Sequence, residues 1–129
     1  MIVLDTHAFL WLAASPDRLS STARTAIADD AERAISAVSA QEIAYLVMRG
    51  RIALDRPAGR WVRDALDAHE VRALPVDLLI SLRAGSLDTR RFHGDPADRV
   101  IYATALSHDA RLVSADERMR TVDPQRLVW

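Results

Sequence analysis

The sequence opens with Met1-Ile2-Val3-Leu4-Asp5-Thr6-His7-Ala8-Phe9-Leu10-Trp11-Leu12, a short apolar run that an acid separates from a longer one. Residues 1–4 are continuous and apolar, which predicts a buried strand. The apolar segment from His7 to Ala14 predicts a helix directly behind it, ended by Ser15-Pro16. Asp5 therefore lies at the end of a buried strand. An unpaired buried carboxylate is costly, so we expect an arginine or a cation to neutralise it.

The composition predicts one compact domain over residues 1–129. The chain has 129 residues, half of them apolar, which is enough for one hydrophobic core. No apolar run approaches the roughly 18 residues of a membrane span, and no basic segment precedes the first apolar run. We therefore expect a cytoplasmic protein without a membrane partner. The lack of cysteine excludes disulfides, thiolate zinc sites and a cysteine nucleophile.

The charged residues narrow the chemistry further. All 17 basic residues are arginine, so lysine Schiff-base chemistry and a P-loop lysine are excluded. The arginine guanidinium is a planar fork that suits phosphate. The net charge of −1 argues against a domain that coats nucleic acid through bulk electrostatics.

Apolar patterns along the chain alternate between strand and helix. This alternation predicts an α/β fold with a mostly parallel central sheet flanked by helices. Functional crevices in such sheets lie outside the carboxyl ends of the strands. The expected strands are 1–4, 34–38, 70–74, 111–114 and 126–129; the expected helices are 7–14, 20–30, 39–49, 57–69, 76–84 and one that begins at Pro96.

Four acids, Asp5, Glu42, Asp98 and Asp116, lie where predicted elements begin or end. Three of them also fit ordinary structural roles. Ser39-x-x-Glu42 matches a capping box, Asp98 suits the first turn of a helix capped by Asp95, and Asp116 could be a turn residue. A carboxylate cluster without regular histidine spacing instead suits Mg²⁺ or Mn²⁺. Metal-assisted phosphodiester chemistry is therefore the leading interpretation.

Four segments, in order, resemble the motifs of PIN-domain ribonucleases. Within this family, the chain resembles the VapC-type toxins of type II toxin–antitoxin systems. The resemblance runs essentially from Met1 to Trp129 and implies a three-layer PIN-like sandwich. Its segments are Leu4-Asp5-Thr6-His7-Ala8-Phe9-Leu10-Trp11, Ser36-Ala37-Val38-Ser39-Ala40-Gln41-Glu42-Ile43, His93-Gly94-Asp95-Pro96-Ala97-Asp98-Arg99 and Leu112-Val113-Ser114-Ala115-Asp116. Ala97 replaces the commoner Phe and Ser114 the usual Thr, and neither change removes a carboxylate.

The resemblance implies a metal-dependent endoribonuclease with one or two Mg²⁺ or Mn²⁺ ions. It carries over Asp5, Glu42, Asp98 and Asp116 as catalytic and metal-binding acids, with Asp95 as an added acid. Of these, we expect Asp5 and Asp98 to bind a metal directly, and Glu42 and Asp116 to bind a second ion or position water. Supporting or substrate-contacting roles fall to Ser114, Arg99, Thr6 and His93.

Partners follow from the same resemblance: RNA as substrate, a cognate VapB-type antitoxin and a second copy in a homodimer. Arg99 would pair with a site carboxylate or contact phosphate. Two alternatives remain open, a non-catalytic PIN-like scaffold and a nuclease for single-stranded or flapped DNA, because a metal site alone does not read the 2′-hydroxyl. Aromatic residues are few, and no base-stacking platform is evident in the sequence.

Overall fold

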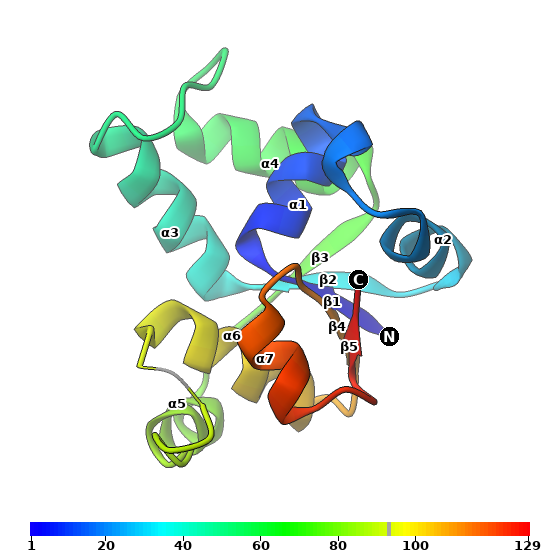
Figure 1. Ribbon diagram of the computed structural model, residues 1–129. Coiled ribbons are helices and arrows are strands. Elements are labelled where there is room, and N and C mark those ends of the chain that lie inside the picture. Colours follow the sequence, from blue (N-terminus) through cyan, green and yellow to red (C-terminus); the bar gives the residue numbers. More distant parts are fainter. Residues whose placement is uncertain (93) are drawn as a thin grey trace.

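The computed structural model describes residues 1–92 and 94–129 as a parallel sheet between two layers of helices (Figure 1). The strand order is β3-β2-β1-β4-β5, and every pair is parallel. The predicted α/β three-layer architecture is therefore confirmed. The elements are β1 (Ile2–Leu4), α1 (Thr6–Ala14), η1 (Pro16–Arg18), α2 (Ser21–Asp29), β2 (Arg33–Ser36), α3 (Ala37–Met48), α4 (Ala58–Ala68), β3 (Val71–Leu74), α5 (Leu78–Gly85), α6 (Pro96–Ser107), β4 (Arg111–Val113), α7 (Glu117–Val122) and β5 (Leu127–Val128).

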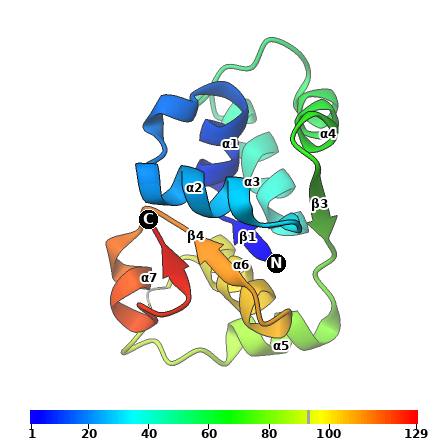
Figure 2. The same cartoon turned by 90° about the vertical axis from the view of Figure 1, so that its right-hand side faces the viewer.

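Alternate side chains of β1 pack into two hydrophobic cores on opposite faces of the sheet. Ile2 and Leu4 pack into the core under α1–α4, whereas Val3 packs into the core under α6 and α7. All three are fully buried. Both views separate α1–α4 from α5–α7 across the sheet (Figure 1, Figure 2). A strand buried on both faces reads as a continuous apolar run, which explains the first four residues of the chain.

The second strand and the helix after it begin earlier than the sequence indicated. We expected a strand over 34–38 and a helix capped by Ser39, but β2 ends at Ser36 and α3 begins at Ala37. The Ser36 hydroxyl oxygen accepts a hydrogen bond from the Val38 amide at 3.4 Å, so Ser36 is the N-cap. The predicted capping box of Ser39 and Glu42 is therefore wrong. Ser39 is buried inside the first turn, and Glu42 lies one turn further along.

A short helix near the C-terminus was not expected. Asp116 is the N-cap of α7, accepting hydrogen bonds from the Arg118 and Met119 amides at 2.8 and 3.4 Å. Six residues are too few for apolar periodicity to appear in a sequence. Only Met119 of this helix is buried, where it joins the core under α6 and α7.

The helices that the structure describes are all too short or too polar to cross a membrane.

Replacing Phe9 by Ala should destabilise the fold strongly. Phe9 is fully buried and meets Trp61 edge-on, with ring centroids 6.1 Å apart. Its removal leaves a cavity that we expect to lower the free energy of unfolding by about 3–5 kcal/mol. Urea denaturation followed by circular dichroism measures the change. Met48→Ala, at a position that is 69% exposed, is the control and should change stability by less than about 0.5 kcal/mol. Equal effects of the two changes would contradict this account of the core.

Candidate active site

The site lies where the chain reverses its direction of travel across the sheet. From β1 the chain adds β2 and β3 on one side, then β4 and β5 on the other. The carboxyl ends of β1 and β4 lie side by side, since Leu4 is in register with Val113 and the Asp5 amide donates to the Val113 carbonyl at 3.0 Å. Ligand sites of open α/β sheets form at such a switch point.

Asp5 is the acid at the centre of this edge. Its side chain accepts a hydrogen bond from the Ala8 amide at 2.7 Å and thereby caps α1. The residue is only 8% exposed. Burial raises the pKa of Asp5, and the negative charge of Glu42 adds to this. The Ser114 hydroxyl, the Ala8 amide and the nearby His7 oppose the rise without cancelling it. The carboxylate therefore sits in an electrostatically unfavourable place despite three stabilising neighbours.

Ser114 links two of the acids. Its hydroxyl group makes a hydrogen bond with the Asp5 carboxylate, and its oxygen accepts the Asp116 amide at 3.1 Å. Ser114 is fully buried. A buried hydroxyl that is satisfied on both sides holds its neighbours in fixed positions. Ser114, in the place of the commoner threonine, thus keeps the hydroxyl group that holds Asp5 and Asp116 at the end of β4.

The negative charges of the other four site acids all act on Asp98. It lies in the first turn of α6, whose N-cap is Asp95, with the Asp95 carboxylate accepting from the Ala97 and Asp98 amides at 3.0 and 3.2 Å. The capping role expected for Asp95 is therefore present. The pKa of Asp98 is raised to about 7, first by burial and then by the negative charge of four neighbours: Asp95, Glu42, Asp5 and Asp116.

Asp116 has an arginine side chain against its carboxylate. The Arg118 guanidinium contacts its carboxylate at 3.1 Å. Partial burial pushes the pKa of Asp116 upward, but the hydrogen bonds from the Arg118 side chain and backbone lower it overall. Asp98 and Asp95 also act on Arg118, which places this cation at the acid cluster. Arg118 was not among the residues expected from the sequence, because its position depends on α7, which the sequence did not predict.

Buried hydroxyl groups tie the site elements together behind the acids. The Thr6 hydroxyl donates to Ser39 at 3.1 Å, which joins the starts of α1 and α3. The Thr104 hydroxyl is 3.2 Å from that of Ser36, which joins α6 to the end of β2. All four residues are at most 1% exposed. Because Glu42 and Asp98 belong to α3 and α6, these contacts hold both acids at the same edge.

Arg99 lies next to Asp98 but its described contacts lead away from the site. Its guanidinium donates to the Ala84, Gly85 and Leu87 carbonyls at 3.1, 3.4 and 2.6 Å, where α5 ends. These contacts satisfy carbonyl groups that a helix end leaves without partners. The two site roles expected for Arg99 stay predictions. His93, the remaining expected site residue, lies outside the described residues.

The donor set fits a hard divalent cation. Five carboxylates could supply oxygen ligands. Burial, together with the negative charge of neighbouring acids, raises the pKa values of Asp5 and Asp98, and a bound cation would offset both effects. Among the described residues, no three Asp, Glu or His side chains already form a metal-binding group. Magnesium usually takes only one or two carboxylates and completes its coordination with waters and substrate phosphate. A preformed three-ligand cage is therefore not required.

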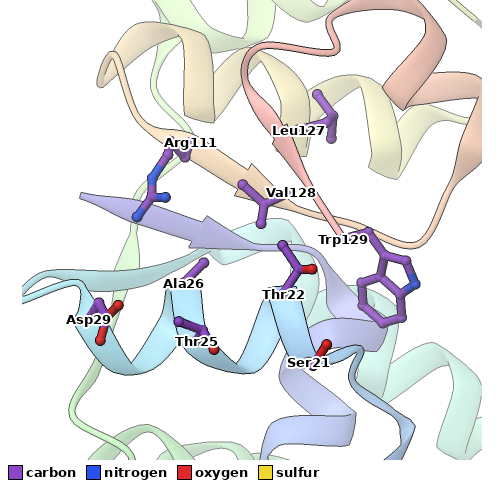
Figure 3. A pocket seen from close by; sticks show the side chains of 9 residues that line it. All are labelled: Ser21, Thr22, Thr25, Ala26, Asp29, Arg111, Leu127, Val128 and Trp129. Carbon is purple, nitrogen blue, oxygen red and sulfur yellow. The ribbon is translucent and has the colours of Figure 1, made fainter.

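One sizeable cavity lies apart from this edge. It has a volume of about 640 Å³ and runs between α2 and the last strand (Figure 3). None of the five site acids lines it; its walls are Ser21, Thr22, Thr25, Ala26, Asp29, Arg111, Leu127, Val128 and Trp129. A second cavity, of about 340 Å³, opens between α3 and the start of α6, and Glu42 and Asp95 belong to its wall.

Known proteins resemble the chain in sequence and in fold. The chain is 40% identical to Ribonuclease VapC22 of Mycobacterium tuberculosis over 120 residues, which cover 93% of the chain and 90% of that protein. A toxin-antitoxin complex from Klebsiella pneumoniae contains a similar fold, with a TM-score of 0.69 and 19% identity. The match covers 100% of the chain and 97% of the Klebsiella chain. VapBC2 from Rickettsia felis, bound to a DNA fragment from its promoter, also contains a similar fold. Its TM-score is 0.68 at 17% identity, and the match covers 98% of the chain and 97% of that protein's chain.

The sequence model of the PIN domain matches residues 2–124, nearly the whole chain. With this match and the VapC relative at 40% identity, the chain belongs to the PIN domain family, as a VapC-type member.

Proposed function

We propose that residues 1–129 form a single PIN domain that acts as a metal-dependent endoribonuclease, the toxin of a VapBC-type pair. The observation that carries the proposal is the gathering of five acids at one edge of the sheet, where burial and the charge of the other four acids raise the pKa of Asp98. Strongly perturbed groups that act on one another are typical of catalytic sites. RNA as the substrate is supported by the 40% identity to Ribonuclease VapC22.

The acids divide the work between metal binding and positioning. Asp5 and Asp98 would bind the ion directly, while Glu42 and Asp116 would hold a second ion or orient a water molecule. When bound, Mg²⁺ or Mn²⁺ would lower the pKa of a water and stabilise charge developing on the phosphoryl oxygens. Ser114 fixes the Asp5 carboxylate through its hydrogen bond. Arg118, an exposed cation at the cluster, is placed to contact the substrate phosphate.

The proposed partners are those of a cytoplasmic toxin that is inhibited by its antitoxin. A VapB-type antitoxin is supported by the structural neighbours, which are toxin–antitoxin complexes. A second copy of the chain stays a prediction from the family resemblance. Three leucines of α5 offer an apolar surface for such contacts, since Leu78, Leu79 and Leu82 are 75%, 60% and 60% exposed.

Replacing Asp98 by Asn should abolish RNA cleavage while the fold stays intact. The amide keeps the shape of the side chain but loses the charge that a hard cation needs, so we expect a loss of about a hundredfold or more. The assay incubates antitoxin-free protein with total RNA in Mg²⁺, Mn²⁺ or chelator, with single-stranded DNA in parallel. Asp67→Asn, at an exposed position of α4, is the matched control and should cleave normally. Cleavage by Asp98→Asn at normal metal affinity would overturn the assignment; metal-dependent cuts in DNA alone would replace the RNA substrate.

The same substitution should stabilise the metal-free protein at high pH. The pKa of Asp98 rises from 3.8 to about 7 on folding, so the folded state keeps a proton that the unfolded chain has lost. Stability of the wild type therefore falls as the pH rises through this window, whereas Asp98→Asn escapes the loss. Urea denaturation in chelator should show the variant to be the more stable protein at pH values above about 7, with the difference shrinking toward pH 4. Added Mg²⁺ should stabilise the wild type more than the variant. A difference that does not change with pH would contradict the proposed repulsion.

A further inference from the structure

The 340 Å³ cavity between α3 and α6 borders the acid cluster, because Glu42 and Asp95 are among the residues that line it. Four of its lining residues belong to α3 and four to the start of α6: Val38, Gln41, Glu42, Tyr45, Asp95, Pro96, Ala97 and Val100. On α3 these positions are spaced by three and four residues, so they form one stripe of the helix. Glu42 and Asp95 stand on the side of the site. Whatever binds at the acids therefore has a hollow immediately beside it.

Tyr45 gives this cavity an aromatic wall. It is 55% exposed, although an aromatic ring of this size is usually buried to a larger extent. In the described part of the chain, no other ring packs on Tyr45 and no hydrogen bond engages its hydroxyl group. Its phenol ring is thus available to a ligand. Tyr45 was not predicted as a site residue, because a lone tyrosine on a helix gives no signal in the sequence until α6 lies opposite it.

The chemistry of the walls selects the kind of ligand. Two carboxylates at the opening, Glu42 and Asp95, repel a phosphate or another anion, but they accept hydrogen bonds from amino groups. The remaining surface is apolar, from Val38, Pro96 and Val100, apart from the exposed amide of Gln41. A neutral, flat ring with polar edges satisfies all of these features. Nucleobases have that shape, and they stack on aromatic side chains.

We propose that this cavity binds one unpaired nucleobase of the substrate, next to the phosphate that is cut, with Tyr45 stacking on the base and Gln41 hydrogen-bonding to its edge. The inference rests on the proposed ribonuclease function, because the acids must place the scissile phosphate beside the cavity. A base inside a duplex cannot enter such a pocket, since it remains stacked and paired. Cleavage is therefore directed to single-stranded positions, and the identity of this base contributes to the choice of the cut.

The test combines changes in the protein with changes in the RNA. A cut made by the wild type in total RNA is mapped first. Short fluorescein-labelled RNAs that span this cut are then prepared, each with one abasic nucleotide in place of a normal one. Their binding is measured by fluorescence anisotropy with Ca²⁺ replacing Mg²⁺, and kcat/KM is measured with Mg²⁺. The proteins are the wild type, Tyr45→Ala, Tyr45→Phe and, as the control on the same helix, Met48→Ala.

We expect Tyr45→Ala to weaken binding of the intact RNA about tenfold, while Tyr45→Phe and Met48→Ala stay close to the wild type. One abasic position flanking the cut should weaken binding to the wild type by a similar factor. Tyr45→Ala should be insensitive to that same abasic position, because the stacking contact is already lost.

Several results would overturn the proposal. If every abasic position costs Tyr45→Ala as much as the wild type, no base stacks on Tyr45. If Tyr45→Ala changes the oligomeric state in light scattering and Met48→Ala shares the loss of binding, the surface joins two copies of the chain instead. If Tyr45→Ala alone fails to bind a purified VapB-type antitoxin while it binds RNA normally, a protein side chain fills the cavity. A wild type that cuts no RNA with either metal would refute the ribonuclease function itself, whereas normal cutting by Tyr45→Ala would refute only this inference.

Discussion

The carboxylate of Asp5 is buried at the end of the central strand, and a charge in such a place must find the partners that water no longer supplies. The Ala8 amide and the Ser114 hydroxyl are those partners. The first requires α1 to begin at Thr6, and the second requires β4 to lie directly against β1. The arrangement of the sheet edge therefore follows from how this one acid is held. The other acids then gather around a charge that cannot move away.

How much of this could be read from the sequence depends on the length of each pattern. The strand before Asp5 and the helix that follows Asp95-Pro96 were predicted, because a continuous apolar run and a capping acid before proline are strong local signals. The predicted start of α3 was wrong. Ser36 and Ser39 are both good N-cap residues, and only the position of β2 in the sheet determines which of them caps the helix. Tertiary contacts decide which serine caps the helix, because the Ser39 hydroxyl accepts a hydrogen bond from Thr6, which is far away in sequence.

Residues whose roles depend on two distant elements were harder to predict. Arg99 neighbours Asp98 in sequence, yet its guanidinium binds carbonyl groups at the end of α5. Arg118 becomes important only because α7 forms and turns it back onto Asp116. The acids themselves were easier to find, because each follows a strand or opens a helix. Local patterns thus indicated the candidate metal ligands, whereas the cations around them required the fold.

The pairing of β1 with β4 has a consequence for when the site can exist. Leu4 and Val113 are neighbours in the sheet although more than a hundred residues of chain separate them. Contacts of such long sequence separation form late, after the loop between them has been closed. While the protein is being synthesised, the Asp5 segment emerges first and has no β4 to receive it. A growing chain on the ribosome therefore cannot assemble its acids, and any activity of this site begins only after β4 has been synthesised.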